Sequence, residues 1–288
     1  VVQKGNIVFE TYQNNMNQLI PNWTLESIKT IYTQPFHDLM YNAHTIHRAH
    51  HQPNHLEVAT LLSIKTGACP EDCGYCPQAA RYHTDIEGND LMQVSHVKAQ
   101  ALRAKASGSS RVCMGAAWRE VKDGPEFNKV LKMIKGIKNL GMESCVTLGM
   151  LNQTQANKLA KAGLKAYNHN IDTSPSFYKK IITTRTFKDR INTIKKVRKA
   201  GITVCCGGII GMGENINDRA KMLQVLSNFK PHPESVPINA LVPSKGTPLG
   251  HRNKITTIEL VRMCAAARII MPKSRVRLSA GRKDLSNE

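Results

Sequence analysis

Short runs of apolar and β-branched residues alternate along the chain with longer stretches in which apolar residues return every three or four positions. The short runs are typical of buried strands and the longer ones of amphipathic helices. Strands are predicted at 57–65, 110–114, 143–147, 166–170, 203–208, 235–239 and 275–279. Helices are predicted at 94–107, 125–140, 152–162, 186–200, 216–229 and 256–271.

This alternation predicts βα units around a parallel sheet. Seven strands are counted, whereas a complete (β/α)8 barrel has eight. We therefore expect an α/β fold, a TIM-type barrel that is incomplete at its C-terminal end. Residues 1–50 are expected to form an N-terminal segment with one leading helix from Thr24 to His50, and residues 51–288 a single barrel domain.

Composition changes this picture little. Hydrophobic residues make up 41% of the chain and charged residues 21%, which is typical of globular proteins. No apolar run is long enough to span a membrane, and the first ten residues do not resemble a secretory signal. The net charge is +19, but the basic residues are scattered over the predicted helices and only 5% of residues are aromatic. We expect no nucleic-acid or membrane partner.

We expect a cytoplasmic location. A mitochondrial location stays open, because the chain begins at Val1 rather than at Met and an N-terminal segment can be missing.

Three closely spaced cysteines carry the clearest chemistry. Cys69, Cys73 and Cys76 stand at C-x3-C-x2-C. Three thiolates at such spacing can hold three irons of a cubane iron–sulfur cluster and leave the fourth iron open to a small molecule. Tyr75 is placed to shield such a cluster. A zinc site with His83 as fourth ligand, in a zinc- or nucleic-acid-binding protein, stays open at this point.

A second set of cysteines falls on separate predicted strands. Cys113, Cys145 and Cys205 are each typical of small buried side chains, but together inside a barrel they can form a second metal site. Strand alternation points Cys205 inward and Cys206 toward the helices. It also points Arg277 inward, where a buried guanidinium needs an anionic partner.

Longer segments resemble the biotin synthases, a family of the radical S-adenosylmethionine superfamily. The matching segments are LLSIKTGACPEDC (61–73), YCPQ (75–78), CMGAAW (113–118), YNHNIDTSP (167–175), IITTRT (181–186), ESVPIN (234–239) and VRLSAGR (276–282). The resemblance covers about residues 23–282 and is far more specific than the cysteine spacing.

The resemblance implies the reaction and its cofactors. It implies a [4Fe–4S] cluster on Cys69, Cys73 and Cys76, a [2Fe–2S] cluster on Cys113, Cys145, Cys205 and Arg277, and S-adenosylmethionine on the open iron of the larger cluster. Reductive cleavage of S-adenosylmethionine would give a radical that removes hydrogen from dethiobiotin, and the smaller cluster would donate the sulfur of biotin. No catalytic side chain is implied, because the cofactors carry the hard step.

The resemblance also implies the contacts to small molecules. Those to S-adenosylmethionine are Tyr75, Gly115, Ala116, Asn170 and Asp172, and those to dethiobiotin are Asn168, Asn170 and Asn239. Neutral amides suit a ureido ring because they both donate and accept hydrogen bonds. His169 is expected to have a structural role, because alternation turns it away from the neighbouring asparagines. A flavodoxin- or ferredoxin-type electron donor and a homodimer are implied as partners.

Two alternatives stay within this fold. The relatives that the chain resembles continue past its end with a last barrel unit and a loop that grips the substrate carboxylate, so the chain can be a truncated or impaired copy. It can also be another radical S-adenosylmethionine enzyme. The second cysteine set with Arg277 argues against that, since sulfur insertion explains it.

Overall fold

Parallel strands form the centre of the structure, a computed structural model that describes residues 22–282 of the chain. The strands are β1 Ala59–Lys65, β2 Arg111–Ala116, β3 Glu143–Thr147, β4 Ala166–Asn168, β5 Thr203–Cys205, β6 Gly208–Ile210, β7 Ser235–Ala240 and β8 Arg275–Leu278. The helices are α2 Leu25–Thr33, α3 Phe36–His50, α4 Val94–Ala106, α5 Pro125–Asn139, α6 Gln153–Ala162, α7 Phe187–Lys199, α8 Ile216–Ser227 and α9 Thr257–Ile270, with a short 3-10 turn η1 at Tyr178–Lys180. Most of the predicted elements are confirmed.

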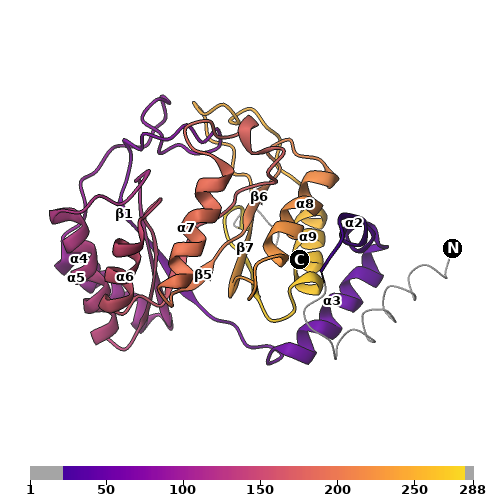
Figure 1. Cartoon of the computed structure of the whole chain (residues 1–288), viewed down its shortest axis with the longest axis horizontal. Helices are drawn as coiled ribbons and strands as arrows, with labels where there is room; N and C mark the ends of the chain where they lie inside the picture. Colours follow the sequence, from indigo (N-terminus) through magenta and orange to yellow (C-terminus); the bar gives the residue numbers. More distant parts are fainter. Residues whose placement is uncertain (1–21, 283–288) are drawn as a thin grey trace.

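All the strand pairs are parallel and belong to one sheet. Neighbouring strands follow the chain from β1 to β5, and β7 then pairs with β5, β6 and β8. Figure 1 shows helices around this sheet, with α2 and α3 lying beyond α8 and α9. The predicted α/β fold, a partial TIM-type barrel, is confirmed.

Strands β5 and β6 are two halves of one barrel strand. Cys205 pairs with Ser235 and Gly208 pairs with Ile238, so the register along β7 is continuous across the break. Gly207 lies in the break because a β-carbon there would be only 1.9 Å from the carbonyl oxygen of Pro237. Counted this way the sheet has seven strand positions, as predicted, and the uninterrupted strand predicted at 203–208 is wrong.

The predicted single leading helix is also wrong. Thr24 does cap a helix, since its hydroxyl accepts a hydrogen bond from the Ser27 amide. That helix ends at Thr33, and α3 begins only after Pro35. Proline has no amide hydrogen and disfavours helical geometry in the residue before it, and Gln34 is accordingly extended, with ψ 154°.

The two faces of the strands carry different side chains. Val112, Met114 and Val204 face the helices and belong to the main hydrophobic core. Cys206 belongs to the same core, whereas Cys205 packs with other cysteines in a separate inner cluster. The alternation predicted for Cys205 and Cys206 is therefore confirmed.

The two edge strands of the barrel, β1 and β8, share no ladder among residues 22–282. An ion pair joins them at one point, with Arg275 Nη2 of β8 at 2.7 Å from Glu57 Oε1, just before β1. Beside it Leu56, Val58 and Leu61 are exposed. The sheet is thus an open barrel over the residues that the structure describes.

Loops that follow β1, β4 and β7 meet at one end of the barrel, the upper end in Figure 1. The Gly74 amide donates to Ile181 O at 2.9 Å, and the Leu249 amide donates to Gly74 O at 3.0 Å. Active sites of such barrels lie at this carboxyl end of the strands. The fold therefore directs attention to the loop that carries the cysteine triplet.

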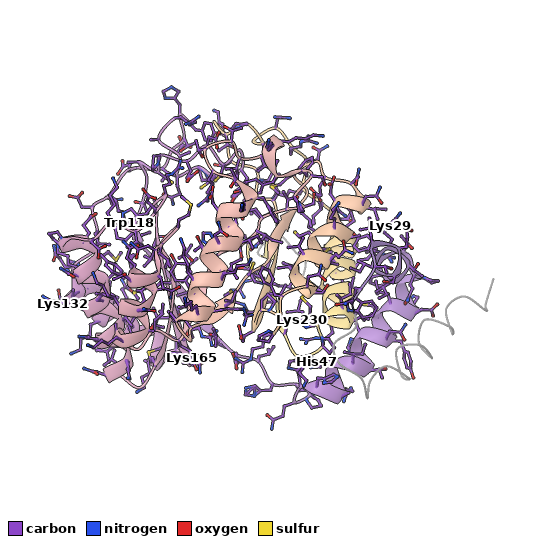
Figure 2. All side chains as sticks on the ribbon, in the orientation of Figure 1. Lys29, His47, Trp118, Lys132, Lys165 and Lys230 are labelled. Carbon is purple, nitrogen blue, oxygen red and sulfur yellow. The ribbon has the colours of Figure 1, made fainter. Side chains whose placement is uncertain are left out.

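Positive charge is distributed widely over the surface. Lys132, Lys165 and Lys230 are exposed on separate elements and lie in different parts of Figure 2. No helix in the described part of the chain is long and apolar enough to cross a membrane. The assignment of residues 51–288 to a single domain stays a prediction.

Two glycine substitutions test the need for close backbone approach inside the barrel. We expect Gly207→Ala to lower the free energy of unfolding by about 3 kcal/mol, because its β-carbon would overlap the Pro237 carbonyl. Gly136→Ala in α5 should instead raise it by about 0.5–1 kcal/mol, because no atom crowds that position and alanine favours helix. Urea unfolding measures both, and equal stability of the two variants would contradict the close approach of Gly207 to Pro237.

Candidate active site

A cavity of about 350 Å³ opens at the carboxyl ends of the first strands. Its wall contains the cysteine triplet, the end of β2, and residues after β4 and before α7 (Leu61, Ser63, Lys65, Cys69, Glu71, Cys73, Tyr75, Cys76, Gly115, Ala116, Trp118, Asn168, His169, Asn170, Asp172, Arg185 and Arg190 among them). The predicted contacts of the cofactor, Tyr75, Gly115, Ala116, Asn170 and Asp172, all line this one space.

The cysteine loop is shaped by its own backbone bonds. The Cys69 amide donates to Gln78 O at 3.0 Å, and the Ala80 amide donates back to Cys69 O at 2.8 Å. The chain enters this loop through Gly67, whose φ of 68° and approach to Gly88 leave no room for a β-carbon. These contacts fold the loop so that Cys69, Cys73 and Cys76 line the cavity together.

Donor geometry separates a multinuclear cluster from a single zinc ion. In residues 22–282 no group of three or more Cys, His, Asp or Glu side chains lies close enough to hold one metal ion. Sulfurs on one tetrahedral zinc are roughly 4 Å apart, since each Zn–S bond is about 2.3 Å, whereas a cubane binds each sulfur to a different iron. His83 is exposed and does not line the cavity. The triplet therefore fits a cluster and gives no support to the zinc alternative.

Burial affects all three thiols of the triplet. It raises the pKa of Cys73 to about 12, and it also raises the pKa of Cys69 and of Cys76. A buried thiol keeps its proton unless a cation replaces it. Iron would supply that cation, so the protonation state of the triplet depends on metal.

The second cysteine set is also brought together, deeper in the barrel. Cys145 and Cys205 belong to one buried cluster with Ala166, and Cys113 packs against this cluster. Cys113 and Cys145 are register partners on β2 and β3. Arg277 on β8 extends toward them, and its Nη2 donates to Cys205 Sγ at 3.0 Å. All four predicted residues thus lie together, next to Leu61, which lines the cavity and pairs with Cys113.

Charge within this second set is unevenly divided. A hydrogen bond from the Cys145 thiol lowers the pKa of Cys113 to about 7, against the effect of burial and with help from Arg277 and Arg111. Burial acts to lower the pKa of Arg277, but the cysteines more than offset it, and the net shift is upward. Its Nε has no hydrogen-bond partner in the described residues. This arrangement suits a guanidinium that faces anionic sulfur.

The polar residues at the end of β4 and just after it divide into two groups. Asn168 and Asn170 line the cavity, and Asn170 Oδ1 accepts a hydrogen bond from the Gly207 amide at 3.1 Å. Asp172, at a φ of 65°, forms a buried ion pair with Arg190. Its carboxylate is thus already held in place before any ligand is considered.

Asn239 is placed differently from the other predicted contacts. It is buried on β7, where its Nδ2 donates to Gly208 O at 3.0 Å and its Oδ1 accepts from the Ala280 amide at 3.1 Å. It is not among the residues that line the cavity. The structure shows that Asn239 bonds to Gly208 at the start of β6 and to Ala280 just after β8. Its contact with substrate stays a prediction.

His169 is buried, as its expected structural role requires, but it also lines the cavity. It follows the last residue of β4, so strict alternation no longer decides its direction. Its ring lies 6.2 Å from that of Tyr167, and its Nε2 has no hydrogen-bond partner among residues 22–282. Burial lowers its pKa well below the usual value.

Several charged residues of the site were not predicted from the sequence. Glu71, Arg185 and Arg190 line the cavity, and Trp118 joins them. The motif IITTRT contains Arg185, but a motif does not reveal which carboxylate or thiol an arginine meets. The partners of Arg185 are Glu71 and Cys73, which lie more than a hundred positions away in the sequence.

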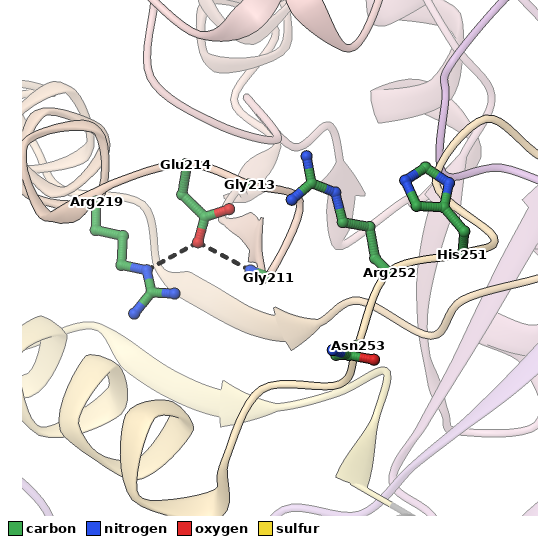
Figure 3. A pocket seen from close by; sticks show the side chains of 7 residues that line it. All are labelled: Gly211, Gly213, Glu214, Arg219, His251, Arg252 and Asn253. Atoms are coloured by element: carbon green, nitrogen blue, oxygen red, sulfur yellow. Dashed lines mark hydrogen bonds and ion pairs between the residues drawn. The ribbon is translucent and has the colours of Figure 1, made fainter.

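A second cavity, of about 380 Å³, lies beside the loop after β6 (Figure 3). Its Glu214 carboxylate accepts hydrogen bonds from the Gly211 amide and from Arg219 Nε, each at 2.8 Å. Arg219 also bonds Tyr32 and Glu259, and so ties this loop to α2 and α9. Glu214 and Arg219 are thus used to hold elements together, and no cysteine is among the residues that line this cavity.

The sequence is similar both to two protein-family models and to individual known proteins. Residues 63–226 match the model of the radical SAM superfamily, and residues 237–288 match that of the biotin and thiamin synthesis associated domain. The chain is 63% identical over 273 residues to a biotin synthase of Flavobacterium psychrophilum, covering 95% of this chain and 75% of the relative. It is 64% identical to one of Christiangramia forsetii, covering 93% and 74%, and 56% identical to one of Synechococcus elongatus, covering 95% and 85%.

Solved structures show the same fold at much lower identity. Methylornithine synthase PylB aligns with a TM-score of 0.75 at 17% identity, covering 94% of this chain and 77% of that one. The hydrogenase maturase HydG of Carboxydothermus hydrogenoformans aligns with a TM-score of 0.75 at 15% identity, covering 95% and 65%. These likenesses establish the architecture and leave the chemistry to the residues described above.

The different pKa values of the two cysteine sets predict different reactivity in metal-free protein. At pH 7 about half of Cys113 would be thiolate, but only about one part in 10⁵ of Cys73, because their pKa values are about 7 and about 12. Iodoacetamide should therefore label Cys113 at least roughly 100-fold faster than Cys73. Arg277→Ala should slow the labelling of Cys113 at pH 7, since it removes a cation that favours the thiolate. Peptide mass spectrometry measures the rates, and equal labelling at pH 7 would disprove the assignment.

The buried ion pair predicts a strong effect of Asp172→Asn on stability. The change leaves Arg190 buried without its carboxylate partner, and we expect it to cost about 3 kcal/mol or more in the free energy of unfolding. Asp123→Asn breaks an exposed ion pair with Lys158 and serves as the matched control, with no measurable loss expected. Guanidinium chloride unfolding of metal-free protein compares them, and similar midpoints would show that the buried pair is not essential.

Proposed function

The chain belongs to the biotin synthases of the radical S-adenosylmethionine superfamily, and on that basis we propose which parts of its barrel bind two iron–sulfur clusters and two small molecules. It is an enzyme of the radical S-adenosylmethionine class, a sulfurtransferase of biotin formation. The proposal concerns which residues bind each cofactor and the substrate.

We assign the [4Fe–4S] cluster to Cys69, Cys73 and Cys76. Their thiols line one cavity without converging on a single point, which suits a multinuclear cluster. Because the triplet supplies three ligands, one iron remains for S-adenosylmethionine. Tyr75 lies in the same wall and would shield the bound cluster from water.

We assign the [2Fe–2S] cluster to Cys113, Cys145, Cys205 and Arg277. Arg277 already donates to Cys205 through Nη2, and its buried Nε has no hydrogen-bond partner among residues 22–282. When bound, the larger cluster supplies the electron that cleaves S-adenosylmethionine and the smaller cluster supplies the sulfur atom. The chain itself would position the reactants between these two thiol sets and exclude water from them.

Small-molecule contacts follow from the lining of the cavity between the two sets. The backbone at Gly115 and Ala116 presents polar groups to the methionine part of S-adenosylmethionine, and Asn170 and Asp172 suit its ribose hydroxyls. Asp172 can accept from a diol while Arg190 keeps it ionised and oriented.

Dethiobiotin would lie between these groups and the inner thiols. Asn168, Asn170 and Asn239 are proposed to bind its ureido ring. Leu61 is 71% exposed although it lies on a barrel strand that lines the cavity, and this gives the apolar chain of the substrate a surface to cover. Asn239 would have to exchange or share its present bonds to Gly208 and Ala280 to take part.

From the relatives alone we propose a flavodoxin- or ferredoxin-type electron donor, a homodimer and a cytoplasmic location.

The observation that carries the proposal is the second thiol set. It brings together three cysteines from three strands and an arginine, next to a cavity that already holds the triplet. A reaction that consumes sulfur explains this arrangement.

Anaerobic reconstitution with iron and sulfide tests this division. Wild-type protein should take up both clusters and form biotin from dethiobiotin when given S-adenosylmethionine and a reductant. Cys145→Ala should lose the visible absorption of the smaller cluster and lower biotin formation at least roughly 100-fold, while cleavage of S-adenosylmethionine persists. Cys264→Ala is the matched control, because Cys264 lies on α9 outside both sets. Uptake of both clusters by Cys145→Ala would refute the ligand assignment.

The same assay separates the remaining alternatives. Both clusters without biotin would indicate an impaired copy or a different radical reaction. Protein that binds zinc but no sulfide would refute the cluster proposal altogether.

A further inference from the structure

Glu71, inside the cysteine loop, is buried in an unusual setting. Only 2% of its surface is exposed, and its Oε1 accepts no hydrogen bond in the described part of the chain. That oxygen lies 3.7 Å from Nε of Arg119 and 3.7 Å from Nε of Arg185. Its Oε2 accepts a hydrogen bond from the Thr184 hydroxyl. Burying a carboxylate in this way costs free energy, and its partners therefore indicate a functional role as well as a packing role.

Arg185 connects this carboxylate to the cysteine triplet. Its side chain is 8% exposed and lines the cavity. Its Nη2 donates toward Cys73 Sγ at 3.9 Å, while its Nε faces Glu71. One guanidinium therefore spans from Glu71 to a sulfur of the triplet, which a planar fork of donors can do and a lysine ammonium cannot.

Neighbouring contacts hold the segment of Arg185 still. Asp72 accepts hydrogen bonds from the backbone amides of Thr183 and Thr184, at 2.9 and 3.1 Å, and from the Thr183 hydroxyl. The cysteine loop and the segment before α7 are thus joined by two successive carboxylates, Glu71 and Asp72. This joint leaves the guanidinium of Arg185 little freedom to move away from Cys73.

We propose that Glu71 positions Arg185 so that its guanidinium donates to the sulfur of Cys73 and raises the reduction potential of the cluster there. The proposal rests on the proposed function, which places a cluster on Cys69, Cys73 and Cys76. Reduction adds a negative charge to the cluster, and a buried cation that donates to its sulfur stabilises the reduced form more than the oxidised form. Arg185 is a tuning residue and Glu71 a positioning residue.

Arg119 has a different place in the same network. It faces the same oxygen of Glu71, but its side chain is 37% exposed, and in the described residues no hydrogen bond joins it to a cysteine. Solvent screens a charge in that position. The effect on the cluster is therefore assigned to Arg185.

A redox titration followed by electron paramagnetic resonance tests the proposal on the full chain, reconstituted anaerobically and without S-adenosylmethionine. At a fixed solution potential, Arg185→Gln should lower the ratio of reduced to oxidised cluster about tenfold, equivalent to about 59 mV for one electron. Arg185→Lys should recover only part of this loss, because it keeps the charge but cannot contact both Glu71 and the Cys73 sulfur. Glu71→Asp should also lower the ratio, because it keeps the charge but withdraws the carboxylate from Arg185. Lys179→Gln, which removes an exposed positive charge six positions before Arg185 in the sequence, should stay within twofold of wild type.

Each contrary outcome has a distinct meaning. A ratio for Arg185→Gln within twofold of wild type would overturn the proposal. Uptake of iron and sulfide by wild type but by neither Arg185 variant would overturn it too, because Arg185 would then be needed for assembly rather than for the potential. Wild-type protein that takes up no cluster would refute the proposed function itself, and this inference with it.

Discussion

Side-chain alternation along parallel strands is the constraint on which the rest of the structure depends. Helices cover the outer face of the sheet, so every second residue must be apolar there, as Val112, Met114 and Val204 are. The intervening residues then face the inside of the barrel, where Cys113 and Cys205 lie. Chemistry inside the barrel is thus a direct consequence of hydrophobic burial outside it, and one register slip would exchange the two faces.

Buried charge is concentrated where the barrel opens, and almost all of it is paired. Asp172 meets Arg190, Glu71 lies between two guanidiniums, and Arg277 donates to a cysteine sulfur. Such pairs do little for stability compared with apolar residues of the same size. Their place around the thiols instead suits a site that must hold cofactors whose charge changes during reaction. Two of the buried atoms that have no hydrogen-bond partner in residues 22–282, Oε1 of Glu71 and Nε of Arg185, belong to residues that line this opening.

Much of the fold and part of the site could be predicted from the sequence, because periodicity and motif spacing depend only on residues that lie close together along the chain. Helix α6 and strand β3 lie where their patterns predicted them. The prediction of one leading helix was wrong because it did not take Pro35 into account, and proline disfavours helical geometry in the residue before it. The partners of Arg185 could not be predicted, since a loop far away in sequence supplies them.

By itself the sequence determined the identity and spacing of the donor atoms: three thiols in one loop, three on separate strands, and amides and a carboxylate after β4. These follow from residue type and from period-two alternation, which need no knowledge of distant contacts. Only the tertiary structure decided that Asn239 braces two strand ends, that β5 and β6 form one interrupted strand, and that Glu71 fixes Arg185 beside Cys73. The reason is physical, because the position of a long charged side chain is set by partners that only folding brings within reach.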